Sequence, residues 1–366
     1  MVSTLKQISQ EAGTSVSTAS LILNGNQAHR FSKQTRDAIL AAADKLGYRP
    51  QRAAQSLVTG KTRNVALILN SLANPFFGAY ASRLQSHLME HGMTAIPFEV
   101  QSEEVEAKGT WLDWIDMRAV DAAIDLQGAM GIGPNSIETY ERFTAHRPII
   151  FRGVSESPLL AKYDRVIIDY DAGVRDLMHH LAEMGRKELG VVTVRGHVPK
   201  PGRSAKQPVG DYTSHRLIQL AEDAELHLPE RRFRGAEIET ADSIEWCRAA
   251  FELLRDHPEI DALIGHNLES SPAVLHGVEM AGRTVGTDLA FATFDDLPIA
   301  KWLGPGITVV GEPFEDVAAK LARMTLQKLG DRSAEPTHER AASRLIVRGS
   351  TDPTVTHEDA VLRRTT

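Results

Sequence analysis

The sequence predicts a small helical head followed by an α/β body of two lobes with parallel sheets. In residues 1–50, three short amphipathic segments are separated by turns. From about residue 62 onward, strand-like apolar runs alternate with amphipathic helical segments, a pattern typical of parallel sheets with helices on both faces. Because this alternation continues for about 290 residues, too many for one ordinary sheet, we expect two similar lobes.

Each helix of the head has a recognisable beginning and end. The residues suited to cap the three helix N-termini are Thr4, Ser15 and Ser32. Gly13, Asn24-Gly25 and Gly47 follow the apolar stripes and are typical helix ends. The stripe expected on the third helix consists of Ile39, Leu40, Ala43 and Leu46.

Two short helices joined at Gly13 indicate a helix-turn-helix, in which the first helix supports the second at a steep angle. The start of the second helix then presents polar side chains to base edges in the major groove of DNA. In this reading the groove-facing residues are Ser15, Val16, Ser17 and Ser20. An ordinary three-helix bundle fits the same segment.

The elements of the body follow from short apolar runs and from helical spacing between them. The expected strands are Val65–Leu69, Ala122–Leu126, Ile149–Phe151, Val166–Ile168, Leu189–Val194, Ala262–Ile264, Leu289–Phe294, Ile307–Val310 and Leu345–Val347. The expected helices include Gly78–His91, Ala172–Met184, Ser243–Asp256, Pro272–Ala281 and Phe314–Leu329.

The charge is divided unevenly along the 366 residues. Residues 1–63 hold nine Lys or Arg and three Asp or Glu, a net charge of +6, so the rest of the chain accounts for −13 of the total of −7. A basic head on an acidic body is expected when only the head meets the phosphates of a nucleic acid.

Composition excludes several classes of protein. With 42% apolar and 24% charged residues, the chain is expected to fold rather than to be disordered. It has no apolar run long enough to span a membrane and no basic-then-apolar leader, so we expect a cytoplasmic protein. The single cysteine, Cys247, excludes an intramolecular disulfide and a CxxC metal site. We expect no cofactor and no metal ion.

Several strings, in their order and spacing, resemble the lactose/galactose repressor family. They begin with TLKQISQEAGTSVSTASLILNG at residues 4–25 and Leu46-Gly47-Tyr48-Arg49-Pro50. In the body they include Asn74-Pro75-Phe76-Phe77, Met184-Gly185-Arg186-Lys187, Phe294-Asp295-Asp296 and Val347-Arg348-Gly349-Ser350-Thr351.

The resemblance implies a helix-turn-helix head at 1–50, a hinge helix at 51–61, two periplasmic-binding-protein-like lobes at 62–351 and a loose tail at 352–366. The chain of such a body crosses between its lobes three times. The implied function is a transcriptional regulator, a repressor of carbohydrate-utilisation genes and not an enzyme. It would bind operator DNA as a homodimer, with affinity set by a small effector such as a sugar.

The resemblance also assigns DNA contacts to the head and hinge. The expected residues are Thr4, Ser15, Val16, Ser17, Ser20, Leu21, Asn24, His29, Ser32, Thr35, Arg36, Tyr48, Ala54 and Leu57. Leu21 departs from the family, in which many members have Arg there, so an apolar contact would replace a hydrogen bond to a base. The segment QRAAQSLVTG is too short and polar for a stable isolated helix, and Leu57 would act as a minor-groove wedge once it folds on DNA. A flexible linker is the alternative.

Effector ligands of two-lobed α/β bodies bind beyond the carboxyl ends of the strands. The residues expected there are Asn70, Asn74, Phe76, Phe77, Arg152, Arg216, His266, Asn267, Asp295 and Glu312. Rings beside polar groups suit a polyhydroxylated ligand, and Arg152 and His266 favour testing acidic or phosphorylated sugars too. Alternatively, Arg152 and Asp295 bridge the lobes as a salt link. Leu268 stands where the family often has an acid.

Two other classes of protein share parts of this pattern. A solute-binding protein of a transport system has the same two-lobed body, but it requires export and offers no reason for a basic head. An NAD-dependent enzyme has doubly wound sheets, but the sequence lacks the glycine fingerprint of a dinucleotide site.

Overall fold

The computed structural model describes residues 4–23, 30–48, 56, 59–100, 119–127, 134–153, 160–194, 232–238 and 242–356. The described residues up to Arg63, together with 119–121, form one compact unit, which contains the head helices. The other described residues form a second unit, the body, which contains both lobes.

The head has the three helices that the sequence predicts, and they are capped as expected. They are α1 (Leu5–Glu11), α2 (Val16–Leu23) and α3 (Lys33–Lys45). The Thr4 side chain accepts a hydrogen bond from the Gln7 backbone in a capping box. Ser15 Oγ accepts from the backbone N–H of Thr18 at 3.0 Å, and Ser32 Oγ accepts from that of Thr35 at 3.2 Å. Gly13 and Gly47 both have φ of 61°, which suits glycine at a helix end.

A small core joins the three head helices, and its buried members are Ile8, Ala19, Ile22, Ile39, Ala42 and Ala43. Leu40, predicted in the inward stripe of α3, is instead 54% exposed. The stripe that faces inward runs through Ile39, Ala43 and Leu46. Because Leu40 follows Ile39 directly, it is turned by about 100° around the helix and leaves that face.

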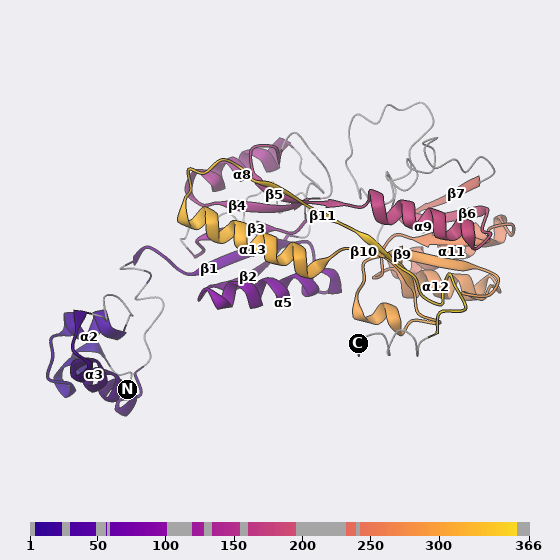
Figure 1. The fold of residues 1–366 in the computed structure, drawn as a ribbon. Coiled ribbons are helices and arrows are strands. Elements are labelled where there is room, and N and C mark those ends of the chain that lie inside the picture. Colours follow the sequence, from indigo (N-terminus) through magenta and orange to yellow (C-terminus); the bar gives the residue numbers. More distant parts are fainter. Residues whose placement is uncertain are drawn as a thin grey trace. The chain divides into compact units, whose positions relative to one another are not determined.

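The N-terminal lobe (N-lobe) is built on a parallel sheet with the strand order β11-β5-β4-β3-β1-β2. Its strands are β1 (Asn64–Leu69), β2 (Thr94–Glu99), β3 (Ala122–Asp125), β4 (Ile149–Gly153), β5 (Asp164–Asp169) and β11 (His338–Ala342). Its helices are α5 (Pro75–Glu90), α8 (Pro134–His146) and α13 (Phe314–Gly330). In Figure 1, α13 lies beside α5 although the two are far apart in the sequence.

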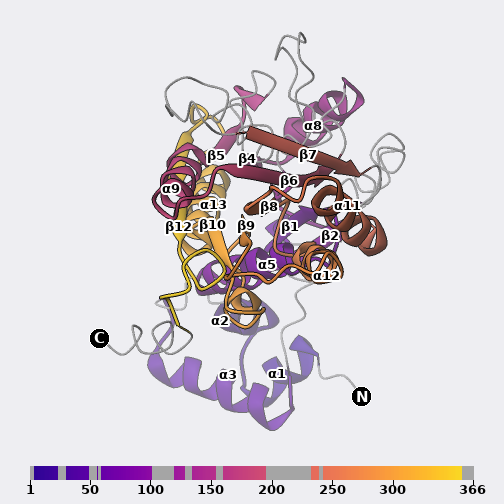
Figure 2. The ribbon, with the colours of Figure 1, turned by 90° about the vertical axis from the view of Figure 1, so that its right-hand side faces the viewer.

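The C-terminal lobe (C-lobe) repeats the design with the order β12-β10-β9-β8-β6-β7, in which only β12 runs antiparallel to its neighbour. Its strands are β6 (Glu188–Val194), β7 (Arg232–Ile238), β8 (Ala262–Gly265), β9 (Ala290–Phe294), β10 (Thr308–Gly311) and β12 (Arg344–Ile346). Its helices are α9 (Asp171–Glu183), α11 (Ser243–Asp256), α12 (Ser271–Met280) and the short η4 (Pro298–Lys301). Figure 2 shows α11 and α12 together, away from α9.

The chain crosses between the lobes three times, as the resemblance implies. The crossings lie at Tyr170, at Glu312-Pro313 and at Ser343. The first and third are hydrogen-bonded, since the Ser343 backbone N–H donates to the carbonyl oxygen of Asp169 at 2.8 Å. Gly173 permits this approach, because a Cβ there would lie 2.6 Å from Ser343 Oγ.

The nine predicted strands are present, but the sequence analysis missed β2, β7 and β11. All three are edge strands of their sheets. An edge strand buries less of its surface, so it needs fewer apolar residues and gives a weaker pattern. In β11, for example, the sequence HERAA buries one residue, Ala341.

We predict that Gly277→Ala loosens the packing of α12 on α11. A Cβ at this position would lie 2.3 Å from the backbone oxygen of Cys247 and 2.9 Å from Ala250 Cβ. We expect a loss of about 1–3 kcal/mol in the free energy of unfolding, measured by urea denaturation with circular dichroism. Gly78→Ala in α5 is the control, because nothing lies within 4 Å of its Cβ position. Equal stability of the two variants would contradict this packing.

Candidate nucleic-acid interface and interlobe cleft

The first turn of α2 presents short, exposed side chains. Ser15, Val16 and Ser17 are exposed, with Val16 at 45%, while Ala19 and Ile22 on the opposite face are buried in the head core. No acidic residue lies in this turn. A helix held by its back face, with its N-terminal turn free and uncharged, can enter a major groove.

The remaining predicted DNA contacts divide into three groups. The hydroxyls of Thr4, Ser15 and Ser32 already serve as helix caps, so they have less freedom to bind phosphate. Half-buried positions are occupied by Ser20, Leu21, Thr35, Arg36 and Tyr48, and Tyr48 packs on the head core. Asn24, His29, Ala54 and Leu57 lie outside the described residues. All these contacts stay predictions.

In the body, a buried ion pair joins the two lobes. Arg152 is the last residue but one of β4 in the N-lobe, and Glu312 directly follows β10 of the C-lobe. Arg152 Nε donates to Glu312 Oε1 at 2.7 Å, and Arg152 Nη2 donates to Glu312 Oε2. The arginine side chain is 4% exposed and the glutamate side chain 0%. The salt link therefore pairs Arg152 with Glu312 and not, as the alternative expected, with Asp295.

Two tyrosines complete the surroundings of the Glu312 carboxylate. Tyr170 donates to Oε2 at 2.7 Å, and Tyr80 donates to Oε1. The guanidinium carbon of Arg152 also lies 4.7 Å from the ring centre of Phe76. We call Tyr80, Arg152, Tyr170 and Glu312 the interlobe cluster.

The protonation states of this cluster follow from its burial. Burial and then the nearby Glu312 carboxylate raise the pKa of Tyr80 and of Tyr170 well above the usual value, so both phenols remain donors. For Arg152, burial is the largest single cause and opposes the charge, but the carboxylate of Glu312 together with Tyr80 and Tyr170 raises the pKa overall. The two phenols and the guanidinium therefore remain hydrogen-bond donors.

Aromatic rings form a wall beside this cluster. Phe76 packs edge-on against Phe77, Tyr80 and Phe314, with ring centres 5.2, 5.3 and 5.4 Å apart. Phe76 is half-buried and carries the contact with Arg152. Phe77, expected at the cleft, lies instead in the N-lobe core with 4% exposure, because it points to the other side of α5.

On the C-lobe side, His266 follows β8 and stacks on Trp246, with ring centres 5.3 Å apart. Its Nδ1 lies 3.3 Å from Thr193 Oγ1. Asp295 follows β9 and is 9% exposed. Its φ is 73°, a backbone conformation that is energetically unfavourable for residues other than glycine. Strain of this kind concentrates at functional sites.

The other predicted cleft residues serve partly structural roles. Asn74 caps α5 through Oδ1, and its Nδ2 donates to Glu269 Oε2 of the C-lobe at 2.5 Å. Asn267 Oδ1 accepts from the Ser270 backbone at 2.9 Å. Asn70 directly follows β1 and is half-buried, and Leu268 is 1% exposed in the core. Arg216 lies outside the described residues.

The sequence analysis missed Tyr80, Tyr170, Trp246 and Glu269. Two of them carried a usable signal. Tyr80 is four residues after Phe76, so it shares a helix face with that residue. Tyr170 directly follows β5, and the residues after parallel strands gather at one edge of the sheet.

Family models match both parts of the chain. Residues 4–51 match the model of bacterial regulatory proteins of the lacI family, and residues 178–351 match a periplasmic binding protein-like domain. The chain belongs to the lacI family. This lacI-family protein is therefore a DNA-binding transcriptional regulator and not an enzyme. No helix in the described ranges is long and apolar enough to cross a membrane.

Known proteins resemble the regulator along nearly its whole length. The ribose operon repressor of Halalkalibacterium halodurans is 23% identical over 96% of this chain and 97% of its own. A lac repressor dimer bound to operator has a TM-score of 0.77 at 18% identity, covering 96% of this chain and 100% of that one. The complex of the regulator CelR with cellobiose has a TM-score of 0.64 at 22% identity, covering 95% and 99%.

We predict that Glu312→Gln destabilises the lacI-family body strongly. The substitution leaves the charge of Arg152 buried without its partner, which costs about 3–5 kcal/mol in the free energy of unfolding. The control is Glu315→Gln, because Glu315 pairs with Arg83 and His87 but its side chain is 70% exposed. That variant should lose less than about 1 kcal/mol. Urea denaturation measures both, and equal losses would contradict a buried ion pair.

Proposed function

We propose that this regulator is a repressor of carbohydrate-utilisation genes, acting as a homodimer in the cytoplasm, whose operator affinity is set by a sugar-like ligand bound between the lobes. The observation that carries the proposal is the placement of three side chains after strands of the two sheets. Phe76 lies in the first turn of α5, which follows β1, and His266 and Asp295 directly follow β8 and β9. Rings that cover an apolar sugar face beside groups that bind hydroxyls suit such a ligand.

The named relatives support this class of ligand. Two of the similar proteins reported above are a ribose operon repressor and a regulator in complex with cellobiose. In this chain, Glu312 neutralises Arg152, so less positive charge is available to a ligand than the presence of Arg152 and His266 in the sequence suggests. We therefore favour a neutral polyhydroxylated ligand over an acidic or phosphorylated sugar.

Exposed apolar side chains support the homodimer. Large examples are Leu72 and Met89 on the N-lobe and Met280, Ile299 and Trp302 on the C-lobe, with exposures from 49% to 65%. Such side chains favour burial against a second copy.

We predict that the purified protein binds a site in its own promoter region, with two chains per site and steep salt dependence. Each basic residue of the head that meets a phosphate releases counterions, so affinity should fall by orders of magnitude between low and physiological salt. Gel shifts at several salt concentrations, with sedimentation for the stoichiometry, measure this. A flat salt response or a tetramer would contradict the proposal.

The same assay tests the hinge. Leu57→Ala should weaken binding to the promoter site far more than binding to random DNA, because a wedge acts only on a bent specific site. Leu40→Ala is the matched control, a 54% exposed leucine of the head outside the predicted contacts. Equal weakening on both kinds of DNA would reject the wedge.

We further predict that Asp295→Ala removes the effect of the ligand on promoter binding and leaves unliganded DNA affinity nearly intact. Calorimetry with ribose, cellobiose, gluconate and glucose 6-phosphate identifies the ligand class and measures the loss of ligand affinity in the Asp295 variant. Asp256→Ala is the control, because this C-lobe carboxylate is 58% exposed and pairs only locally with Arg255. Unchanged ligand affinity in the Asp295 variant would place the site elsewhere.

A further inference from the structure

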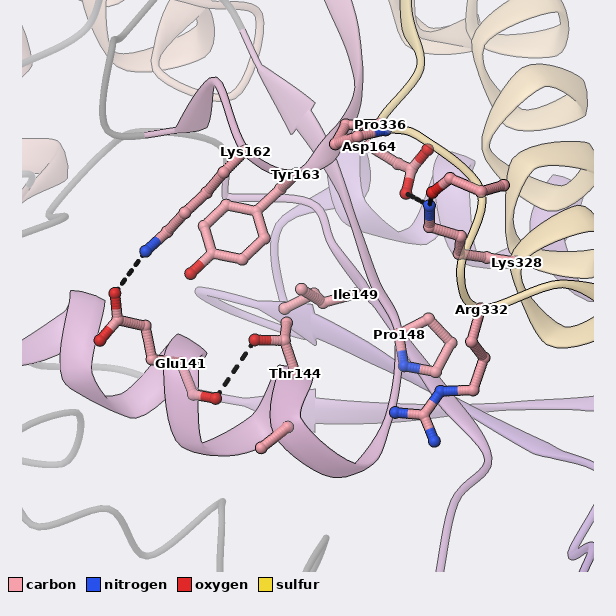
Figure 3. Close-up of a pocket in the computed structure, with 12 residues that line it drawn as sticks. Glu141, Thr144, Pro148, Ile149, Lys162, Tyr163, Asp164, Lys328, Arg332 and Pro336 are labelled. Carbon is pink, nitrogen blue, oxygen red and sulfur yellow. Dashed lines mark hydrogen bonds and ion pairs between the residues drawn. The ribbon is translucent and has the colours of Figure 1, made fainter.

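The N-lobe contains a cavity of about 460 Å³ at the edge of its sheet where β4 and β5 begin. The interlobe cluster lies at the opposite edge, where β4 ends. The walls come from the end of α8, the starts of the two strands, the end of α13 and the segment that leads to β11 (Figure 3). This volume falls in the range of small-molecule sites.

The charged side chains of the cavity leave one cation without a counter-charge. Lys162 pairs with Glu141, and Lys328 pairs with Asp164 at 3.3 Å. Arg332 is exposed and has no hydrogen bond or ion pair within the described part of the chain. Figure 3 shows its guanidinium beside Pro148, on the same side of the cavity as Lys328.

A buried hydroxyl without a partner lies in the same cavity. Tyr163 is 7% exposed, and its hydroxyl makes no hydrogen bond of good geometry to a described residue, although Lys162 and Thr144 lie near enough to influence its pKa. Its ring packs against Phe151 at 5.2 Å, and Lys162 Nζ lies 5.4 Å from the ring centre. Burial raises the pKa of the phenol, so it remains a donor. Buried polar groups nearly always have a partner, which makes this hydroxyl a candidate for a ligand contact.

We propose that this cavity is a second ligand site, separate from the interlobe cleft, for a small organic anion that carries a phosphate or carboxylate group. Arg332 binds the anionic group, since a guanidinium matches two oxygens of either group. Tyr163 donates a hydrogen bond to the ligand. The inference does not depend on a sugar ligand or on the operator.

Two walls of this cavity belong to segments that continue to crossings between the lobes. One wall is the end of α13, whose first residue follows the crossing at Glu312-Pro313. Residues 332–336 of another wall lead directly into β11, which ends at the crossing of Ser343. An anion bound here therefore contacts two segments that continue into the other lobe.

Calorimetry on the full chain, at constant ionic strength in sodium chloride, tests the site with glycerol 3-phosphate and acetate as probes. We expect saturable binding of at least one probe and a loss of about tenfold in affinity for Arg332→Gln, because a charge-assisted hydrogen bond is removed. Arg175→Gln is the control, since Arg175 is exposed on α9 of the C-lobe. It should bind the probe like the unaltered protein.

Tyr163→Phe separates a ligand contact from a structural role. The variant should fold with an unchanged or higher melting temperature, because it removes only an unpaired hydroxyl, and it should bind the probe more weakly. Asp295→Ala should leave probe binding intact, which distinguishes this site from the cleft. The proposal is overturned if neither probe saturates, if Arg332→Gln binds like the unaltered protein, or if Asp295→Ala abolishes the binding.

Discussion

The arrangement of the two lobes depends on one buried carboxylate. Glu312 has no exposed side-chain surface, and it lies at a crossing between the lobes. Burying a carboxylate costs several kcal/mol unless opposite charge and hydrogen bonds compensate. The compensation comes from Arg152 of β4, from Tyr80 of α5 and from Tyr170 at another crossing. Because these donors come from separate elements, the carboxylate is satisfied only when the elements have this arrangement.

This dependence affects how a ligand acts in the cleft. Opening the lobes would separate Glu312 from Arg152 and expose both side chains to water. This would reduce the desolvation penalty of the two charges but break the hydrogen bonds between them. A ligand that binds between the lobes must therefore keep the cluster or replace its donors with groups of its own. In the proposed function, Phe76 and Asp295 contact the ligand while the ion pair stays intact, since neither contributes a hydrogen bond to the Glu312 carboxylate. On that proposal, the ligand and the ion pair stabilise the same arrangement of the lobes.

Local rules were enough to predict most elements, and long-range pairing was the part that they missed. The caps at Thr4, Ser15 and Ser32 are decided within a few residues, so the sequence alone predicted them. The partner of Arg152 is 160 residues away, and the spacing of charges cannot distinguish Glu312 from Asp295. Phe76 and Phe77 are adjacent in the sequence, and only the packing of α5 decides which one faces the core. The edge strands were missed because they bury few side chains.

The interleaved path of the chain also governs how the protein is made. The last strand of each sheet, β11 in one lobe and β12 in the other, comes from residues 338–346. During synthesis, neither sheet gains its final edge strand until almost the whole body has left the ribosome. Until then, β5 and β10 present unpaired backbone groups that other chains can pair with. A truncated chain that ends before residue 338 would therefore contain neither a complete N-lobe nor a complete C-lobe, and it would be prone to aggregate.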